Sequence, residues 1–312
     1  MSSAPGFEPP HHAAIRPTTF LEPEWLASRL GLPITLATET FQQTGSFKFR
    51  AAYHVAATVA PCRFITASSG NFGQALACAC RKLGKTCTVV MPQTSVQAKI
   101  EAVRAYGGMV DLLDVRSKTR DRRVAELAEQ DPDAYVASPF DDPLVIAGNA
   151  TLGVELARAG RTFDCILAPV GGGGLTAGLI TGLTHAGANI PVVGVEPLLA
   201  NDAARSLRTG QLVANDVEPL TLADGVRTLS VGRHNWPILR QGLREIVEVT
   251  EDHIRQAVRL LFLDATLKAE PTGALSVAAL LAQPDKFRGR RVCCVISGGN
   301  VDARTYAEII AG

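Results

Sequence analysis

One lysine in the sequence stands between two aromatic residues, in the segment Gln43-Thr-Gly-Ser-Phe-Lys-Phe-Arg50. We expect Lys48 near the start of a helix, just after a glycine turn. An amine that Phe47 and Phe49 shield from water has a lowered pKa and, once neutral, can attack a carbonyl carbon. A surface lysine whose stem packs on apolar neighbours is the alternative. The segment therefore offers a candidate for covalent catalysis.

Four consecutive glycines, Gly171 to Gly174, follow an apolar run and precede a helical pattern. At such a turn the free amides and the helix dipole favour an anion, and a plain connection would not need four residues that are costly to order. The spacing Gly172-x-Gly174-x-x-Ala177, with Glu196 after the next apolar run, also fits a dinucleotide fingerprint. The segment alone leaves a phosphate cradle and a dinucleotide site open.

Two further turns have the same design of strand, Ser-Gly turn and helix. They are Ala67-Ser-Ser-Gly-Asn-Phe-Gly-Gln74 and Val295-Ile-Ser-Gly-Gly-Asn-Val-Asp302. Free amides in the first of these would bind a carboxylate well, whereas a turn capped by Ser or Asn is the plainer interpretation. Three such turns in one chain, with a lysine before them, indicate a binding function more strongly than any one of them alone.

Short runs rich in Val, Ile and Leu alternate with stretches of helical period, which predicts an α/β fold of parallel strands joined by helices. Expected strands span 63–66, 86–91, 109–113, 134–137, 164–170, 192–196 and 291–297. Expected helices span 72–83, 96–105, 119–129, 144–158, 175–185 and 253–267. Thr94 and Gln97 form a possible capping box before residue 96, and Gly84, Gly107 and Gly160 stand where helices should end.

The Pro- and Asp-rich segment 138–143 and the weaker break at Pro61 bracket four of the expected strands. We therefore expect a small domain of residues 61–142 inserted in a large domain of residues 1–60 and 143–312. Two α/β lobes of this kind would place a ligand in the cleft between them.

The composition narrows the class of protein. The 312 residues include 31 Lys and Arg against 30 Asp and Glu, so there is no strong field to attract nucleic acid. We expect neither a nucleic-acid partner nor a membrane partner, because no apolar run is long enough to span a bilayer. The first residues lack the basic and apolar regions of a signal peptide, and seven cysteines without a C-x-x-C pair suggest buried thiols, so we expect a cytoplasmic protein.

Taken together, these segments resemble the fold type II pyridoxal phosphate enzymes, in particular the group of serine/threonine dehydratases and serine racemases. The resemblance covers nearly the whole chain, in both order and spacing. It rests on Thr44–Arg50, Ser68–Gln74, Val145–Gly148, Pro169–Gly174, Gly194–Pro197, Ala223–Gly225, Glu270–Gly273 and Ser297–Asp302. It implies two parallel-sheet lobes with pyridoxal 5'-phosphate in the cleft and Lys48 as the lysine that binds the cofactor's aldehyde.

The resemblance also implies roles for residues around the cofactor. Phe47 would lie against the ring, Asn71 would hydrogen-bond its phenolic oxygen, and Ser297 would face the pyridine nitrogen. The loop Gly171, Gly172, Gly173 and Gly174 would hold the phosphate. The backbone of Ser68, Ser69, Gly70 and Asn71 would take the substrate carboxylate, and Ser69 resembles the acid/base residue of the racemases.

The implied activity is a dehydratase that converts a 3-hydroxy amino acid such as L-threonine or L-serine to a 2-oxo acid and ammonia. The alternative on the same scaffold is a serine or hydroxyaspartate racemase, and an oxidoreductase based on the dinucleotide fingerprint is a third hypothesis. Family likeness further implies a homodimer and a Mg²⁺ or Ca²⁺ site of Glu196, Ala200 and Asp202. An acidic loop without a metal is the alternative.

Three positions depart from the family pattern. Phe72 replaces a histidine and Phe140 a polar residue that often contacts the cofactor, so the site should be more apolar than in relatives and less suited to plain serine. Thr266 stands where nucleotide-activated racemases have lysine, which argues against activation by ATP.

Overall fold

The computed structural model describes residues 13–68 and 70–312. A six-stranded sheet forms one half of the molecule, with strand order β1-β2-β10-β7-β8-β9. Its strands are β1 (Thr19–Leu21), β2 (Ile34–Thr38), β7 (Cys165–Pro169), β8 (Val192–Pro197), β9 (Leu243–Val249) and β10 (Val292–Ile296). All neighbours are parallel except the edge strand β1, which pairs antiparallel with β2, so the sheet is mixed.

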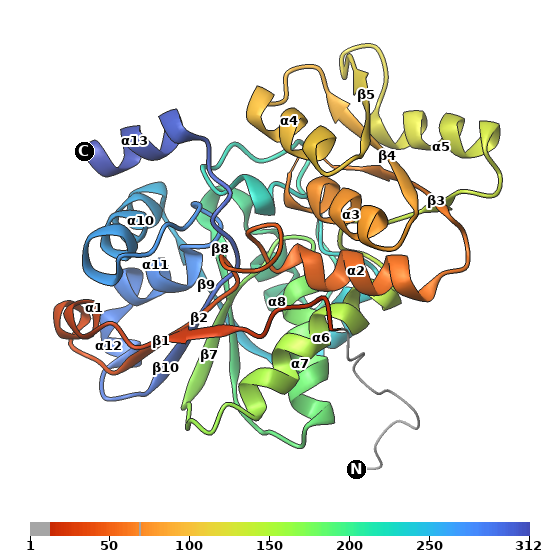
Figure 1. Ribbon diagram of the computed structural model, residues 1–312. Coiled ribbons are helices and arrows are strands. Elements are labelled where there is room, and N and C mark those ends of the chain that lie inside the picture. The colour runs from red at the N-terminus through yellow and green to blue at the C-terminus, as the bar shows by residue number, and fades with distance from the viewer. Residues whose placement is uncertain (1–12, 69) are drawn as a thin grey trace.

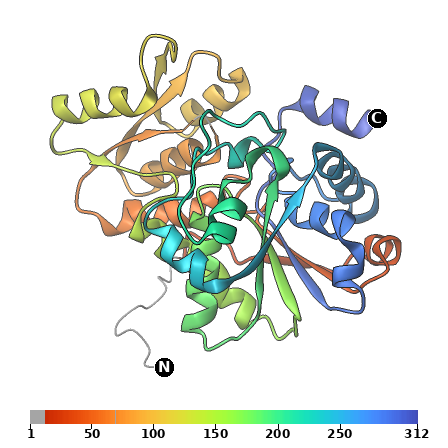
Figure 2. The same cartoon turned by 180° about the vertical axis from the view of Figure 1, so that it is seen from behind.

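A second, fully parallel sheet of four strands has the order β5-β4-β3-β6. It consists of β3 (Arg63–Ala67), β4 (Thr86–Pro92), β5 (Met109–Leu113) and β6 (Tyr135–Val136). In Figure 1 this sheet occupies the upper right of the molecule, apart from the larger one, and Figure 2 shows the same separation from behind. The α/β class with parallel sheets is confirmed.

Helices cover both faces of the large sheet. One face packs on α1 (Glu24–Leu30), α10 (Glu251–Ala265), α11 (Leu275–Ala282), α12 (Pro284–Phe287) and α13 (Ala303–Ala311), and the other on α6 (Pro143–Ala157), α7 (Gly174–His185) and α9 (Asn235–Gly242). Strand β10 shows why, because Val292, Cys294 and Ile296 enter one core and Cys293 and Val295 the other. Alternate apolar residues thus serve two faces, as a buried parallel strand requires.

The small sheet has helices on both faces as well. Helices α2 (Lys48–Thr58), α3 (Asn71–Lys82) and α4 (Gln97–Ala105) pack on one face, and α5 (Arg120–Gln130) packs on the other. The remaining short helices are α8 (Asp202–Thr209), η1 (Leu198–Ala200) and η2 (Asp224–Val226). All four strands of this sheet come from residues 63–136, which fits the expected insertion, but α2 shares its core with α3. The domain boundaries stay a prediction.

Two sequence-based expectations about helix ends have different outcomes. Gly84, Gly107 and Gly160 adopt the left-handed backbone at helix ends, as expected. The capping box predicted at Thr94 is wrong, because the residue before α4 is Val96 and no side chain of the described residues caps that helix. A capping box does form at Thr250, where the side chain of His253 replaces the usual acid or amide.

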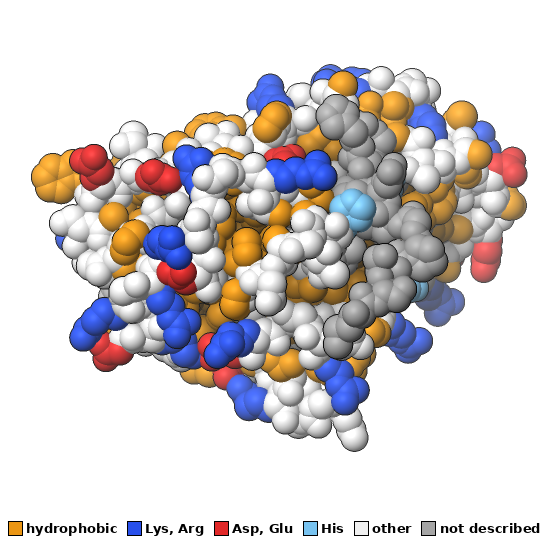
Figure 3. Space-filling view, turned by 90° about the horizontal axis from the view of Figure 1, so that it is seen from below, with side chains coloured by type: hydrophobic (Ala, Val, Ile, Leu, Met, Phe, Trp, Pro, Cys, Tyr) orange, Lys and Arg blue, Asp and Glu red, His pale blue; other side chains and the backbone are white. Residues whose placement is uncertain are grey.

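The cysteines and the surface agree broadly with the composition. Six of the seven thiols are buried, and only Cys62 is exposed. No helix in the described ranges is long and apolar enough to cross a membrane. On the face seen in Figure 3, Lys and Arg side chains are more prominent than Asp and Glu, and both are interspersed with apolar side chains.

Candidate active site

Lys48 is the first residue of α2, and its amine lies in a largely apolar corner. Its Nζ donates a hydrogen bond to the carbonyl oxygen of Pro139 at 2.6 Å and lies 5.1 Å from the centre of the Phe47 ring and 5.8 Å from that of Phe72. Burial lowers the pKa of Lys48 to about 8, although the charge of Glu270 opposes this shift. The amine is therefore partly neutral near physiological pH.

The expectation that Phe49 shields this amine is wrong in one respect. Phe49 is fully buried in the core beside Tyr53, with ring centres 5.5 Å apart, and the second ring near the amine is that of Phe72. Phe72, at the position where the family resemblance implies a histidine, thus places an apolar ring beside the lysine's amine.

The start of α2 is held against the carboxyl end of β10. The amide of Phe47 donates to the carbonyl of Ser297 at 2.9 Å, and Ser46 forms an isolated bridge with Gly298. The Oγ of Ser297 is buried and has no hydrogen-bond partner among the described residues. An unpartnered buried hydroxyl beside the lysine is unfavourable unless a ligand atom completes it.

The four-glycine loop connects β7 to α7, as expected. Gly173 has a φ of +88°, which favours glycine, and a Cβ at Gly171 would lie 2.8 Å from Val226. A Cβ at Gly172 would overlap the ring of Phe140, and one at Gly174 would lie 2.7 Å from the Phe140 carbonyl. The first amides of α7 have no partner within the helix, so the loop forms a narrow cradle suited to an anion.

The third turn lies between β3 and α3. The Oγ of Ser68 accepts hydrogen bonds from the amides of Gly73 at 3.1 Å and Gly70 at 3.4 Å. Ser69, expected as an acid/base residue, lies outside the described residues. Asn71 opens α3, and its Oδ1 accepts from the Nδ2 of Asn300 at 2.8 Å, which joins this turn to the one that follows β10.

Glu270 is a site residue for which the sequence predicted no role, although it belongs to one of the segments that carry the resemblance. Its Oε1 accepts from the Nδ2 of Asn71 at 2.7 Å. Burial raises the pKa of Glu270 to about 8, the charge of Asp224 adds to the shift, and the hydrogen bond from Asn71 opposes it. Glu270 is therefore largely protonated at neutral pH.

An ion pair joins the two halves of the molecule close to Glu270. Lys99 of α4 donates to the carboxylate of Asp224 in η2, and both charges act on Glu270. Val226, in the same short helix, contacts Gly171. The small-sheet half is thus connected through η2 to the glycine cradle.

The three residues expected to bind a metal lie at and just after the end of β8. Both oxygens of Glu196 accept backbone amides, from Ala203 at 3.2 Å and Ala204 at 2.7 Å. The Oδ2 of Asp202 is buried and has no hydrogen-bond partner in the described part of the chain, and burial raises the pKa of Asp202 to about 6. Within the described residues no group of three His, Cys, Asp or Glu side chains could hold a metal. The predicted site has only two such side chains, and its third ligand would be the backbone carbonyl of Ala200.

The same geometry contradicts the oxidoreductase hypothesis. In a dinucleotide site Glu196 would bind a ribose hydroxyl, but here it is fully buried and both its oxygens cap the start of α8. It is not exposed to a ligand as large as a ribose, whereas a single ion would need only the remaining lone pairs of its oxygens.

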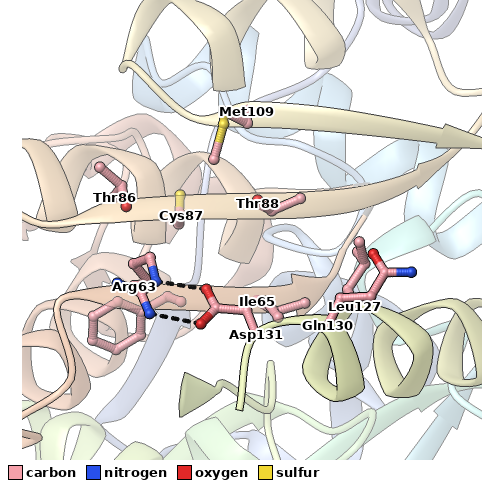
Figure 4. A pocket seen from close by; sticks show the side chains of 10 residues that line it. Arg63, Ile65, Thr86, Cys87, Thr88, Met109, Leu127, Gln130 and Asp131 are labelled. Carbon is pink, nitrogen blue, oxygen red and sulfur yellow. Dashed lines mark hydrogen bonds and ion pairs between the residues drawn. The ribbon is translucent and has the colours of Figure 1, made fainter. Parts of the chain in front are cut away.

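A cavity of about 140 Å³ on the small sheet is not part of this site (Figure 4). Its lining includes Arg63, Thr86 and Met109, which are the first residues of β3, β4 and β5. Ser68 and Asn71 follow the opposite, carboxyl end of β3. Ligands of open α/β sheets bind at carboxyl ends, so the cavity of Figure 4 lies at the wrong edge.

Comparisons with known proteins agree with this geometry. A family model described as "Pyridoxal-phosphate dependent enzyme" matches residues 12–298. The chain is 34% identical over 291 residues to an L-threo-3-hydroxyaspartate ammonia-lyase of Pseudomonas sp., covering 92% of this chain and 91% of the relative. It is also 34% identical to the serine racemase of Homo sapiens, covering 93% of this chain and 89% of the relative.

Solved structures give the same result. A threonine deaminase from T.th. is 41% identical and superposes with a TM-score of 0.87, covering 92% of this chain and 94% of that one. Maize serine racemase is 26% identical, with a TM-score of 0.88 over 95% of this chain and 92% of that one.

Proposed function

Because the chain belongs to the family of pyridoxal-phosphate-dependent enzymes, we propose that it is a dehydratase that deaminates a 3-hydroxy amino acid such as L-threonine or L-serine. A proton is removed from Cα and the hydroxyl group leaves Cβ, so that one molecule of water is eliminated. Hydrolysis of the resulting enamine then releases ammonia and a 2-oxo acid. The observation that carries the proposal is the amine of Lys48, with a pKa of about 8, in a corner that also holds the glycine cradle and the unpartnered Ser297 hydroxyl.

The residues present fit the cofactor. We propose that Lys48 binds its aldehyde, that Gly171, Gly172, Gly173 and Gly174 hold its phosphate, and that the Ser297 Oγ faces its ring nitrogen. Phe47 would pack on the ring and Asn71 would bond its phenolic oxygen. When bound, the cofactor supplies a conjugated system that accepts the electron pair left at the substrate's Cα.

The protein supplies orientation and proton transfer. Asn71 is the first residue of α3, and we propose that the amides of Ser68, Ser69, Gly70 and Asn71 bind the substrate carboxylate. The Nζ of Lys48 can take the Cα proton, because a pKa of about 8 lets it both lose and regain a proton near neutral pH. The rings of Phe47 and Phe72 keep water from this amine.

A racemase acting on serine or hydroxyaspartate is the second candidate, because serine racemases stand among the similar proteins. Racemisation needs a proton donor on the face of the substrate opposite Lys48, and Ser69 is our candidate for that role. Chiral chromatography after incubation with L-serine distinguishes the two activities. Ser69→Ala should remove D-serine formation and leave elimination from L-serine in place.

We also propose that Glu196, Asp202 and the carbonyl of Ala200 bind Mg²⁺ or Ca²⁺. Support comes from the unpartnered Oδ2 of Asp202 and from Glu196, whose pKa is raised well above its usual value by burial and by the charge of Asp202. A cation would offset the cost of two buried carboxylates. Thermal unfolding with and without EDTA tests this, and no change in Tm would contradict it.

A homodimer in the cytoplasm is the expected physical form. Trp25 on α1 and Leu263 on α10 support an interface, because these apolar side chains are 79% and 67% exposed on helices joined by the Arg29–Asp264 ion pair. Light scattering of the purified protein measures its mass, and a monomer would contradict the dimer.

Turnover tests the main proposal. The cofactor-loaded protein is offered L-threonine, L-serine and L-threo-3-hydroxyaspartate, and 2-oxo acid release is measured. Lys48→Ala should lower the rate by roughly 10³-fold or more and remove the visible absorbance of lysine-bound cofactor.

Lys85→Ala is the matched control. Lys85 also donates to a backbone carbonyl, that of Val59 at 2.6 Å, and lies 5.5 Å from the Phe64 ring, but it is remote from the cradle. It should leave both signals intact. Retention of either signal in Lys48→Ala would overturn the proposal.

A further inference from the structure

Two buried asparagines lie behind the glycine loop. We propose that Asn149 of α6 and Asn235 of α9 are positioning residues that aim the loop's amides at the cofactor's phosphate. The inference rests on the proposed cofactor site and concerns residues for which the sequence indicated no role. Both side chains are almost completely buried, with exposed fractions of 1% and 0%.

Asn235 holds the second glycine of the loop from outside the cradle. Its Nδ2 donates to the carbonyl of Gly172 at 2.6 Å, and the amide of Gly232 donates to the same oxygen at 3.0 Å. Only Nδ2 can donate to a carbonyl, so this contact also fixes which way the side-chain amide is turned. The Gly172 carbonyl is thereby held by two donors on one side of the loop.

Asn149 holds the fourth glycine in the same manner. Its Nδ2 donates to the carbonyl of Gly174 at 3.0 Å, from the neighbouring helix α6. Close packing makes this possible, because a Cβ at Gly178 of α7 would overlap the Asn149 side chain. Glycine at position 178 therefore leaves the room that Asn149 occupies.

These contacts determine where the loop's amides point. In a trans peptide the carbonyl and the following N–H point in opposite directions. Holding the carbonyl of Gly172 turns the N–H of Gly173 to the other side, and holding that of Gly174 does the same for Leu175. Gly172 and Gly173 precede α7 and are conformationally free, so without such contacts the N–H of Gly173 would adopt several orientations. Gly174 and Leu175 are already helical, and the contact from Asn149 reinforces the direction that α7 sets.

The cost of the arrangement also favours a functional role. The Oδ1 atoms of Asn149 and Asn235 are both buried and have no partner among the described residues. An unsatisfied buried acceptor destabilises the protein. Leucine has as many side-chain heavy atoms and lacks that acceptor, but it also removes the side-chain donor to the glycine carbonyl. Each asparagine thus keeps one unpaired acceptor, and its donor group is what distinguishes it from leucine.

Asn235 has a second contact that connects the cradle to the lysine. Its Nδ2 also donates to the carbonyl of Phe140 at 3.0 Å, and the carbonyl of the preceding Pro139 accepts from Lys48. Asn149 makes no such contact, so it provides the cleaner test of the phosphate cradle.

The test compares three probes on the full-length protein freed of cofactor. Dissociation constants are measured for pyridoxal phosphate, for pyridoxal, which lacks the phosphate, and for inorganic phosphate. Asn149→Leu and Asn235→Leu should weaken pyridoxal phosphate and inorganic phosphate by about tenfold each and leave pyridoxal within about twofold of wild type.

Ser276→Ala is the matched control, because the Ser276 Oγ is another buried donor to backbone carbonyls, those of Leu167 and Val295, both at 3.0 Å. Ser276→Ala should lower Tm without a selective loss of affinity for pyridoxal phosphate or inorganic phosphate. Where a leucine variant does not fold, as judged by circular dichroism, the alanine variant at that position takes its place with the same expected ratio of affinities.

Two results would overturn the inference: unchanged affinity for pyridoxal phosphate in both variants, or an equal loss for pyridoxal and pyridoxal phosphate. Failure of the wild-type protein to bind pyridoxal phosphate at all would instead overturn the proposed function.

Discussion

The Nε of Arg50 lies 2.8 Å from the Oε2 of Glu39, and neither side chain is more than 1% exposed. Arg50 also donates to Glu155 at 2.8 Å and to Thr151 at 2.9 Å, both in α6. It follows Lys48 by two residues, so this buried charge network attaches the lysine's helix to the end of β2 and to α6.

Arg50→Met should destabilise the protein by about 3–5 kcal/mol, because it leaves the carboxylate of Glu39 buried without its partner. Urea unfolding followed by circular dichroism measures the change. Arg63→Met is the control, since it breaks an exposed pair with Asp131 and should change stability little. An equal change in the free energy of unfolding in the two variants would contradict the larger contribution of the buried network.

The lowered pKa of Lys48 predicts a pH dependence of cofactor capture. Only the neutral amine attacks an aldehyde, so the rate at which the cofactor-free protein forms its visible band should rise with pH and level off above about 8. Stopped-flow absorbance across this range measures it. A rate that is still increasing toward the ordinary lysine pKa near 10.5 would show that the amine is not desolvated.

The raised pKa of Glu270 predicts a loss of stability with rising pH. The folded protein holds this proton up to about pH 8, whereas the unfolded chain releases it near 4.5, so the folded state binds more protons in between. The contribution of Glu270 is therefore present below pH 4.5 and is lost as pH rises toward 8. Glu270→Gln should reduce this decline in Tm for the cofactor-free protein. If Tm falls equally with pH in wild type and in Glu270→Gln, the raised pKa of Glu270 is contradicted.

Thr266 ends α10 with a φ of +51°, an unfavourable conformation for a β-branched residue. Thr266→Gly should stabilise the protein by about 1 kcal/mol, because glycine adopts this conformation without steric cost. Thr184→Gly, at an ordinary helical position in α7, should destabilise it by a similar amount. Chemical denaturation of both variants tests the sign, and a loss of stability in Thr266→Gly would contradict the interpretation.

The sequence predicted the elements whose apolar pattern is continuous. Strands such as β8 and β10 are buried along their whole length, so their composition alone identifies them. Strands β1, β2 and β9 escaped prediction for different reasons. The first is three residues long, β2 follows directly after Pro33, and β9 lies at the sheet edge with charged residues such as Arg244 between its buried ones.

The same limit applies to the site. Lys48 and the three glycine-containing turns were predictable because unusual residue types mark them. Pro139 and Asn235 were not, because a backbone carbonyl carries no sequence signature and an asparagine in a polar segment looks ordinary. Asn149 had a usable signal, since it is a polar residue within an otherwise apolar helical stretch.

The ion pair of Lys99 and Asp224 should make the site sensitive to ionic strength. Its side chains are 24% and 38% exposed, so added salt weakens their attraction, whereas the interior contacts are hardly affected. Separation of the two sheets should become easier as ionic strength rises. The rates at which substrate enters and product leaves the site would then increase with salt, whereas the rates of the chemical steps would not change.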